Sequence, residues 1–221
     1  MCGIAGLLNP AGNARALVSA MVDTLVHRGP DADGVWVDQA AGVALGHRRL
    51  SILDLSPAGS QPMPSATGRY VLSYNGEIYN FQDLRKELEQ LGYPFRGHSD
   101  TEVLVAAFDN WGVDRALQRI DGMFAFAVWD REERELTLAR DRVGKKPLYY
   151  GWSGNTFLFG PELKAFLASP GFDDALDRNA PGESLRSGWV PAPHSIYSSA
   201  LQLAAGRLLR VPLAGPPWSA E

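Results

Sequence analysis

The chain has 221 residues, of which 45% are hydrophobic and 21% are charged. This length and composition are those of a folded protein with a sizeable core, and they exclude wholesale disorder. The formal net charge is −4, and Lys and Arg are spread along the chain rather than gathered in a basic stripe. Nucleic acid is therefore excluded as an expected partner.

Targeting and redox signals are also weak. The sequence lacks the run of about eighteen apolar residues that a membrane helix needs, and its N-terminus lacks the layout of a signal peptide. One cysteine cannot form an internal disulfide, and with four scattered histidines it does not supply a closed zinc site. We expect a cytoplasmic protein with no membrane contact and no metal.

Apolar periodicity predicts the elements in chain order. The opening residues 2–8 form a short buried strand, and apolar side chains from Leu17 to Leu25 recur at helical spacing. Two further helices are predicted, one over 81–91 and one whose apolar face runs from Leu104 to Trp111. Strand-like apolar runs occupy 34–37, 43–45, 70–74, 124–129, 136–139, 148–152 and 157–159.

The helix that contains Leu104 carries a start signal. Ser99 is followed three residues later by Glu102, which is the pattern of a capping box. In such a box the Ser99 side chain accepts from the amide of Glu102 while the Glu102 carboxylate reaches back. Asp100 then falls in the first turn of the helix.

The order of these elements indicates the fold class. Short polar turns between the strands favour antiparallel pairing. The helices gather between groups of strands, which favours an α+β fold of two antiparallel sheets covered by helices. We expect one domain over residues 2–172. Residues 173–221 are rich in Gly, Pro, Ala and Ser with little periodicity, so they are predicted to be a docked arm or a linker.

Cys2 directly follows the initiator methionine. Removal of Met1 would place a thiol and a free α-amino group on one residue. Because that amino group has an ordinary pKa of about 7.7 to 8.0, it can take the thiol proton and leave the attacking thiolate. The alternative is a small buried apolar residue near a terminus, and position alone favours that alternative.

Asn75-Gly76 follows an apolar run. On its own this dipeptide is typical of a hairpin turn. An Asn amide beside a Gly backbone N–H is also the pair of donors that an oxyanion hole requires.

A substrate with an α-carboxylate and an α-amino group requires a bidentate cation and a carboxylate, and Arg49 and Asp100 are candidates for these roles. Alternatively, Arg49 is a solvated charge at a strand edge, and Asp100 only favours a helix N-terminus. His47 is expected to be structural. The pair Lys145-Lys146 is typical of a charged turn and is assigned no chemistry.

Together these segments resemble the glutaminase domain of asparagine synthetase, a class II glutamine amidotransferase of the N-terminal nucleophile hydrolase type. Several blocks in the right order over about residues 2–170 are far more specific than one short motif. The blocks are CGIAG (2–6), HRGPD (27–31), HRRLSI (47–52), QP (61–62), NGEIYN (75–80), SDTE (99–102), DGMFAF (121–126), RD (140–141) and LKA (163–165).

The resemblance implies a four-layer αββα sandwich of two antiparallel sheets and the hydrolysis of L-glutamine. The thiolate would attack the side-chain carboxamide, ammonia would leave as a γ-glutamyl thioester forms, and water would release glutamate. The roles implied are Cys2 as nucleophile, Asn75 and Gly76 as the oxyanion hole, Arg49 for the α-carboxylate, Asp100 for the α-amino group, and Glu77 with the backbone around Ile52 and Leu53 for the rest of the pocket.

Related amidotransferases that feed sugar or nucleotide synthesis share the Cys, the Asn-Gly and the acidic residue. The stretches 47–61 and 75–80 are more similar to asparagine synthetase, which implies ammonia for asparagine biosynthesis from aspartate. A relative that makes β-lactams has lost the nucleophile, whereas Cys2 is retained here.

The sequence departs from the family at several places. Pro161 replaces a usual Ser, and because Pro suits a first helical position we expect a changed cap rather than a lost helix. The tail resembles the family only weakly, through 189–197. There is no Ser-Gly-Gly-x-Asp-Ser loop to hold pyrophosphate, so no cofactor is expected in this chain. ATP and Mg are expected only in the synthetase domain or subunit that would be its partner.

Two hypotheses follow for the function. The first is an active glutaminase that delivers ammonia to a synthetase, with a homodimer as an assembly to test. The second is a non-catalytic remnant that acts as a binding or regulatory module. A remnant would be expected to have a broken pocket, and the intact Cys2, Arg49, Asn75, Gly76 and Asp100 favour the enzyme.

Overall fold

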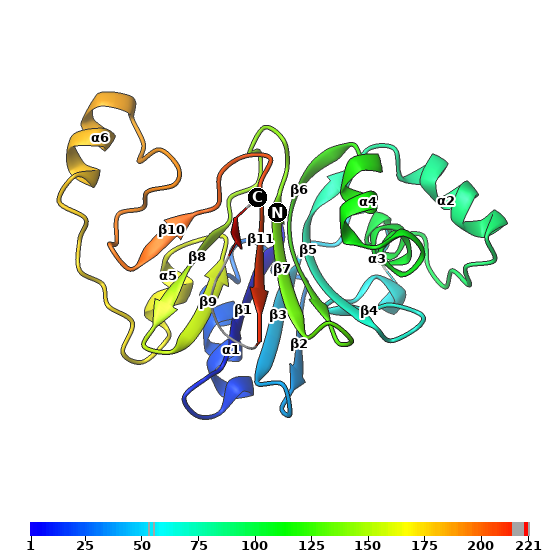
Figure 1. Cartoon of the computed structure of the whole chain (residues 1–221), viewed down its shortest axis with the longest axis horizontal. Helices are drawn as coiled ribbons and strands as arrows, with labels where there is room; N and C mark the ends of the chain where they lie inside the picture. The colour runs from blue at the N-terminus through cyan, green and yellow to red at the C-terminus, as the bar shows by residue number, and fades with distance from the viewer. Residues whose placement is uncertain (53, 55, 214–218, 221) are drawn as a thin grey trace.

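The structure is a computed structural model that describes residues 1–52, 54, 56–213 and 219–220. These residues form two six-stranded antiparallel sheets (Figure 1). The first sheet has the order β10 (Ala200–Gln202), β8 (Tyr149–Ser153), β9 (Thr156–Gly160), β1 (Gly3–Leu8), β3 (Val43–Arg49), β2 (Ala32–Asp38). The second has the order β12 (Ser219–Ala220), β11 (Leu208–Pro212), β7 (Glu135–Arg140), β6 (Gly122–Asp130), β5 (Tyr70–Ile78), β4 (Met63–Pro64).

Helices cover the outer faces of both sheets, and Figure 1 shows them on opposite sides of the sheet pair. The second sheet is covered by α2 (Phe81–Gln90), α3 (Asp100–Trp111) and α4 (Val113–Arg119). The first sheet is covered by α1 (Ala14–Asp23) and α5 (Lys164–Leu167). A 3-10 turn, η1 (Pro57–Gly59), precedes β4, and α6 (Ala180–Ser187) lies beyond α5 in the chain.

The buried side chains form three clusters that fill the three spaces between these layers. Phe108 and Phe126 belong to the cluster between α3 and the second sheet. Leu45 and Trp129 pack between the two sheets. Val18 lies in the cluster between the first sheet and α1. The layers therefore follow the order helix, sheet, sheet, helix, and the predicted four-layer α+β sandwich is confirmed.

Strand β6 illustrates why these sequences pack on two faces. Phe124, Phe126 and Val128 belong to the cluster under the helices. Ala125 and Trp129, which have the other parity, belong to the cluster between the sheets. Side chains alternate across a strand, so a continuous apolar run is what a strand buried on both faces requires.

Most predicted elements are present, often longer than expected. The run 70–74 is part of β5, and the helix predicted over 81–91 is α2. The short helices α4 and α6 and the strands β4, β10, β11 and β12 were not predicted. Helix α5 begins at Lys164, so Pro161 lies before the helix rather than at its first position.

Half of the predicted capping box is confirmed. The Ser99 side chain accepts from Glu102 N at 3.2 Å. The Glu102 carboxylate accepts instead from Arg96 N and Gly97 N, at 2.7 and 2.8 Å. It therefore organises the loop before α3 rather than the Ser99 amide.

The segment 173–221 contributes to both sheets. Ala200–Gln202 pairs with β8, and Leu208–Pro212 pairs with β7. Leu209 and Val211 are buried between the sheets. These parts of the expected arm thus belong to the sheets. Among the described residues no helix is both long and apolar enough to cross a membrane.

Candidate active site

A cavity of about 260 Å³ opens beside Cys2, just before β1 begins. Seven of the eight predicted site residues line it: Cys2, Arg49, Ile52, Asn75, Gly76, Glu77 and Asp100. The eighth, Leu53, lies outside the described residues. The other lining residues are Met1, Leu50, Asp54, Gly59, Gln61, Tyr74, Ser99, Thr101, Met123 and Lys146.

Cys2 is held by its backbone and by its sulfur. Leu50 N donates to the Cys2 Sγ at 3.4 Å, and Arg28 Nε donates to the Cys2 carbonyl at 3.1 Å. Burial raises the pKa of the Cys2 thiol, and the charge of Asp100 adds to that effect, while the Leu50 hydrogen bond, the charge of the chain's amino group and the charge of Arg49 act to lower it. The thiol therefore needs positive charge nearby to ionise at neutral pH.

Arg28 is itself fixed by a carboxylate. Its Nη1 donates to Glu162 Oε1 at 2.7 Å, just before α5. Burial acts to raise the pKa of Glu162, but hydrogen bonds from Arg28, His27 and Lys164 lower it to about 2. Glu162 is thus charged at neutral pH and holds Arg28 against the backbone of Cys2.

Asn75 and Gly76 lie within β5, opposite Ala125 and Phe124 of β6. The hairpin-turn alternative for this dipeptide is therefore wrong. A side chain at Gly76 would overlap the carbonyl oxygen of Met123, so the close approach of the two strands requires glycine.

The Asn75 side chain is buried, at 2% exposure, and its Nδ2 has no hydrogen-bond partner within the described part of the chain. Buried polar groups in native proteins are nearly always paired, so such an atom calls for an explanation. A donor that awaits a substrate oxygen at the cavity provides one.

Asp100 is the first residue of α3, and its carboxylate forms part of the cavity wall. Oδ2 accepts from the Tyr74 hydroxyl at 2.7 Å and from Ile78 N at 3.0 Å. Burial raises the pKa of Asp100, while these two hydrogen bonds act to lower it. The carboxylate is therefore held in one orientation by the strand that carries Asn75.

Arg49 ends β3 and packs on the loop that leads to η1. Its guanidinium donates to Ser56 O at 3.1 Å and to the carbonyl of Asp54. Hydrogen bonds from His98 N and from Ser56 lower the pKa of the Asp54 carboxyl to about 2. Arg49 is thus positioned by a loop that an ionised carboxylate ties to the segment before α3.

The two remaining predicted residues occupy the rim of the cavity. Ile52 has 73% of its surface exposed, and Glu77 is also exposed. Both line the cavity without being enclosed by it. They are placed where they could contact a substrate as it enters.

His47 has the structural place that was expected. It is buried, with its Nε2 3.1 Å from the Tyr74 carbonyl oxygen, and it is absent from the cavity lining. Burial lowers its pKa to about 4. The ring is therefore neutral at physiological pH and joins the two sheets as a donor to Tyr74.

Sequence reasoning missed several lining residues. Gln61 Oε1 accepts from Tyr74 N at 2.7 Å, and Gln61 Nε2 donates to Thr101 at 3.3 Å, so this side chain joins the strand to α3. Its presence in the Gln-Pro block was the available signal. Lys146, which was assigned to a charged turn, is buried at the cavity wall. The residues around it in the sequence gave no signal of this burial.

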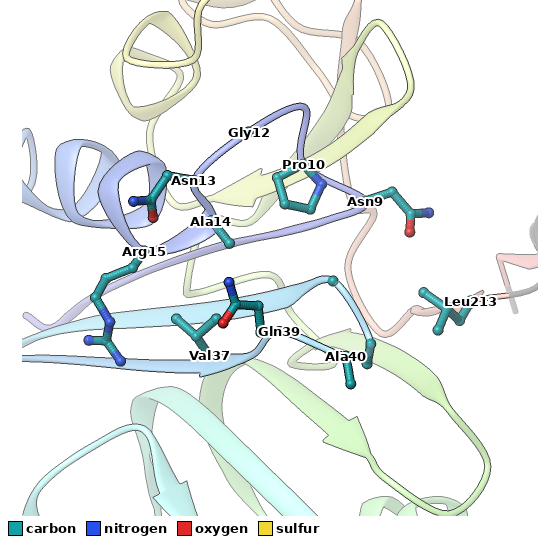
Figure 2. A pocket seen from close by; sticks show the side chains of 12 residues that line it. Asn9, Pro10, Gly12, Asn13, Ala14, Arg15, Val37, Gln39, Ala40 and Leu213 are labelled. Atoms are coloured by element: carbon teal, nitrogen blue, oxygen red, sulfur yellow. The ribbon is translucent and has the colours of Figure 1, made fainter.

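A larger hollow of about 670 Å³ lies at the other end of β1, where Asn9, Arg15 and Gln39 line it (Figure 2). A strand rises about 3.3 Å per residue, so the six residues of β1 separate the hollow from Cys2 by roughly 20 Å. Arg15 is the one charged side chain among its described lining residues. This hollow is therefore separate from the cavity at Cys2.

With this geometry established, comparison with known proteins identifies the family. Residues 1–216 match the family described as "Glutamine amidotransferase domain". The chain belongs to this family. Within it, the chain is 42% identical over 188 residues to "Asparagine synthetase [glutamine-hydrolyzing] 3" of Bacillus subtilis, which covers 83% of this chain and 30% of that protein.

A second relative and a solved structure agree. "Asparagine synthetase [glutamine-hydrolyzing] 1" of Bacillus subtilis is 36% identical over 211 residues, which are 93% of this chain and 33% of the relative. The chain thus spans about a third of the length of these glutamine amidotransferase relatives. The glutamine phosphoribosylpyrophosphate amidotransferase of B. subtilis has a TM-score of 0.74 at 22% identity, over 100% of this chain and 49% of that chain. This likeness confirms the predicted N-terminal nucleophile hydrolase fold.

Proposed function

We propose that this glutamine amidotransferase domain hydrolyses L-glutamine to glutamate and ammonia with Cys2 as the nucleophile. The observation that carries the proposal is Asn75 Nδ2, which has no partner in the part of the chain that the structure describes and belongs to a residue of the cavity that also contains Cys2. Leaving a buried donor unpaired costs about 1–3 kcal/mol. A donor of this kind suits an oxygen that becomes negatively charged during acyl transfer.

In the proposed reaction the Cys2 thiolate attacks the carbon of the glutamine side-chain carboxamide. The carbonyl oxygen becomes an oxyanion, which accepts hydrogen bonds from Asn75 Nδ2 and the Gly76 backbone. The carbon–nitrogen bond then breaks, the nitrogen takes a proton and leaves as ammonia, and a γ-glutamyl thioester remains. Water attacks the thioester, which releases glutamate and restores the thiol.

Removal of Met1 is a required step of this proposal. Met1 lines the cavity, so its removal enlarges the space beside Cys2 as well as freeing the α-amino group. That amino group can take the thiol proton and later donate a proton to the departing ammonia.

Two charged side chains of the cavity suit the other end of glutamine. Arg49 offers a planar guanidinium for the α-carboxylate, and Asp100 offers a fixed carboxylate for the α-amino group. Ile52 and Glu77, which line the cavity, complete the proposed pocket. A substrate that lacks either charged group would leave one of the two cavity charges unpaired, which lowers its affinity.

The destination of the ammonia is a further part of the proposal. The relatives' names support transfer to an ATP-dependent synthetase domain or subunit that makes asparagine from aspartate. ATP and Mg would bind in that part, and this chain would need no cofactor of its own. We also propose a cytoplasmic location, which a single unpaired cysteine supports.

The test is glutamate release from L-glutamine by the purified chain, with the N-terminal mass measured on the same sample. We expect release by the processed chain and loss of release in Cys2→Ala, whose small side chain still permits Met1 removal. Arg15→Ala, in the separate hollow, serves as the control that retains activity. A correctly processed chain that releases no glutamate, even with a synthetase partner added, would favour the non-catalytic alternative.

A further inference from the structure

The loop between β7 and β8 brings a lysine to the nucleophile. Lys146 lines the same cavity as Cys2 and Asn75, and it is only 7% exposed. Its neighbour Lys145 is exposed. Two adjacent lysines therefore have different environments, and only the second contributes to the cavity wall.

The loop is held rigidly on both sides of Lys146. The Asp141 carboxylate, which is fully buried, accepts from the backbone N of Phe124, Val143, Lys145 and Lys146 at 2.9–3.2 Å. The Arg140 guanidinium donates to the carbonyls of Lys146, Gly144 and Leu203, at 2.7, 2.8 and 2.6 Å. The backbone of Lys146 is thus fixed through both its N–H and its C=O.

Among the described residues no carboxylate oxygen lies within 4.0 Å of the Lys146 ammonium, so the ammonium forms no ion pair there. Burial and the charge of Arg28 lower its pKa, while the negative charges of Asp141, Cys2 and Glu77 act to raise it. Of these three groups, Asp141 is already bonded to backbone amides, and Glu77 is exposed at the rim. Asp100, which lines the same cavity, is bonded to the Tyr74 hydroxyl and to Ile78 N. The Cys2 thiolate is therefore the charge in the shared cavity that the ammonium can pair with.

We propose that Lys146 is a positioning residue of the active site, whose ammonium stabilises the thiolate of Cys2 across the cavity. This inference deepens the proposed function, on which its meaning for catalysis rests. Burial alone favours the neutral thiol, and a fixed positive charge offsets that effect. The thiol proton passes to the α-amino group or to water, so Lys146 keeps its own proton throughout.

Because Cys2 is the only cysteine of the chain, alkylation by iodoacetamide reports on this thiol alone. The experiment measures the alkylation rate against pH, on samples with confirmed removal of Met1. Lys146→Met removes the charge and keeps the length of the side chain. Lys146→Arg keeps a positive charge, and Lys145→Met removes the neighbouring exposed charge as a matched control.

We expect Lys146→Met to react about 10-fold more slowly at pH 7, with its pH profile displaced upward by about one unit. Lys146→Arg should react much faster than Lys146→Met, and Lys145→Met should match the parent. Urea unfolding checks the fold, and Lys146→Gln replaces Lys146→Met if the latter does not fold. The inference is overturned if the neutral variants keep the parent profile, or if Lys146→Arg behaves like Lys146→Met.

Alkylation needs no glutamine turnover, so the two proposals fail in different ways. If the neutral Lys146 variants keep the parent pH profile and the chain releases glutamate, the role of Lys146 is wrong and the proposed glutaminase activity is retained. A displaced profile in a chain that releases no glutamate retains the pairing of Lys146 with Cys2 and removes the proposed function.

Discussion

Asn75 and Asn80 lie in the same motif, but their side chains have different hydrogen-bond environments. Asn75 Nδ2 is buried with no hydrogen-bond partner among the described residues, whereas the side chain of Asn80 at the end of the same motif has a partner for both its polar atoms. Asn80 Nδ2 donates to Arg119 O, and its Oδ1 accepts from Asp121 N, both at 2.9 Å. The two asparagines therefore allow catalysis to be separated from stability.

We predict that Asn75→Ala lowers kcat for glutamate release by about 10²–10³-fold, because a donor to the oxyanion is lost. Its free energy of unfolding should stay equal or rise, because the fold loses an unpaired polar group. Asn80→Ala should show the reverse, with activity kept and stability lowered by about 1–3 kcal/mol. Steady-state kinetics and urea unfolding of both variants decide the matter. Equal loss of stability in both would contradict an oxyanion role for Asn75.

At this scale the site residues that the sequence predicted, apart from Leu53, belong to blocks of the family motif, whereas the missed lining residues include Gln61 of one such block and Lys146, which lies outside them. Cys2, Asn75 and Asp100 could be predicted because their blocks match a family. Lys146 could not, since an exposed lysine and a buried one look alike in a charged turn. Asp141 accepts from the backbone N of both lysines, and Arg140 donates to the carbonyl of Lys146 alone of the two, so the difference depends on tertiary hydrogen bonds.

Helix α3 connects local sequence signals to the cavity. Ser99 caps its N-terminus, and the next residue is Asp100, which bonds Tyr74 and Ile78 of β5. The start of the helix therefore fixes a proposed substrate contact as well as the helix itself. Helix α1 offers a comparison, because Asn13 caps it by accepting from Ala16 N at 3.1 Å, away from the cavity.

We predict that Ser99→Ala and Asn13→Ala each lower the free energy of unfolding by about 1 kcal/mol, because each removes one cap. Only Ser99→Ala should raise KM for glutamine, because it loosens Asp100, the residue proposed to bind the α-amino group. Urea unfolding and initial-rate kinetics on the two variants provide the comparison. If KM rises equally in both, the link between the α3 cap and the substrate is wrong.

Elements were predictable where periodicity is strong and where turns are short. Strand β5 shows the limit, because Asn75-Gly76 signals a turn but lies inside the strand. Pairing with β6 over nine residue positions outweighs that local preference. The Glu102 carboxylate shows another limit, since a capping pattern does not state which of several nearby amides the side chain will meet.

At the scale of the whole molecule, the two sheets share an interior to which the last part of the chain contributes. Strand β11 covers the edge of β7 and buries Leu209 and Val211, at 3% and 1% exposure. Leu203, at 2% exposure, packs in the same cluster and its carbonyl accepts from Arg140. Composition predicted an arm here, because the segment is rich in Gly, Pro and Ser and its few apolar residues, which pack between the sheets, show no clear periodicity.

A pair of truncations tests how far the fold depends on this segment. A chain of residues 1–213 keeps β10 and β11, and a chain of residues 1–199 lacks both. We predict that the longer one folds and releases glutamate. Besides Ala200, the shorter one loses the buried side chains of Leu203, Leu209 and Val211. These three are worth about 1.5–3 kcal/mol each, which together approach the stability of an ordinary domain.

Removal of β11 also exposes the edge of β7, which favours aggregation. In the shorter chain Arg140, which holds the loop of Lys146, loses its hydrogen bond to the Leu203 carbonyl. Cys2 should therefore become less reactive in any shorter chain that remains folded. Soluble yield, urea unfolding and iodoacetamide alkylation measure these three effects. Equal urea midpoints for the two chains would show that residues 200–213 only rest on the sheets, because strands that complete a shared core cannot be removed without cost to it.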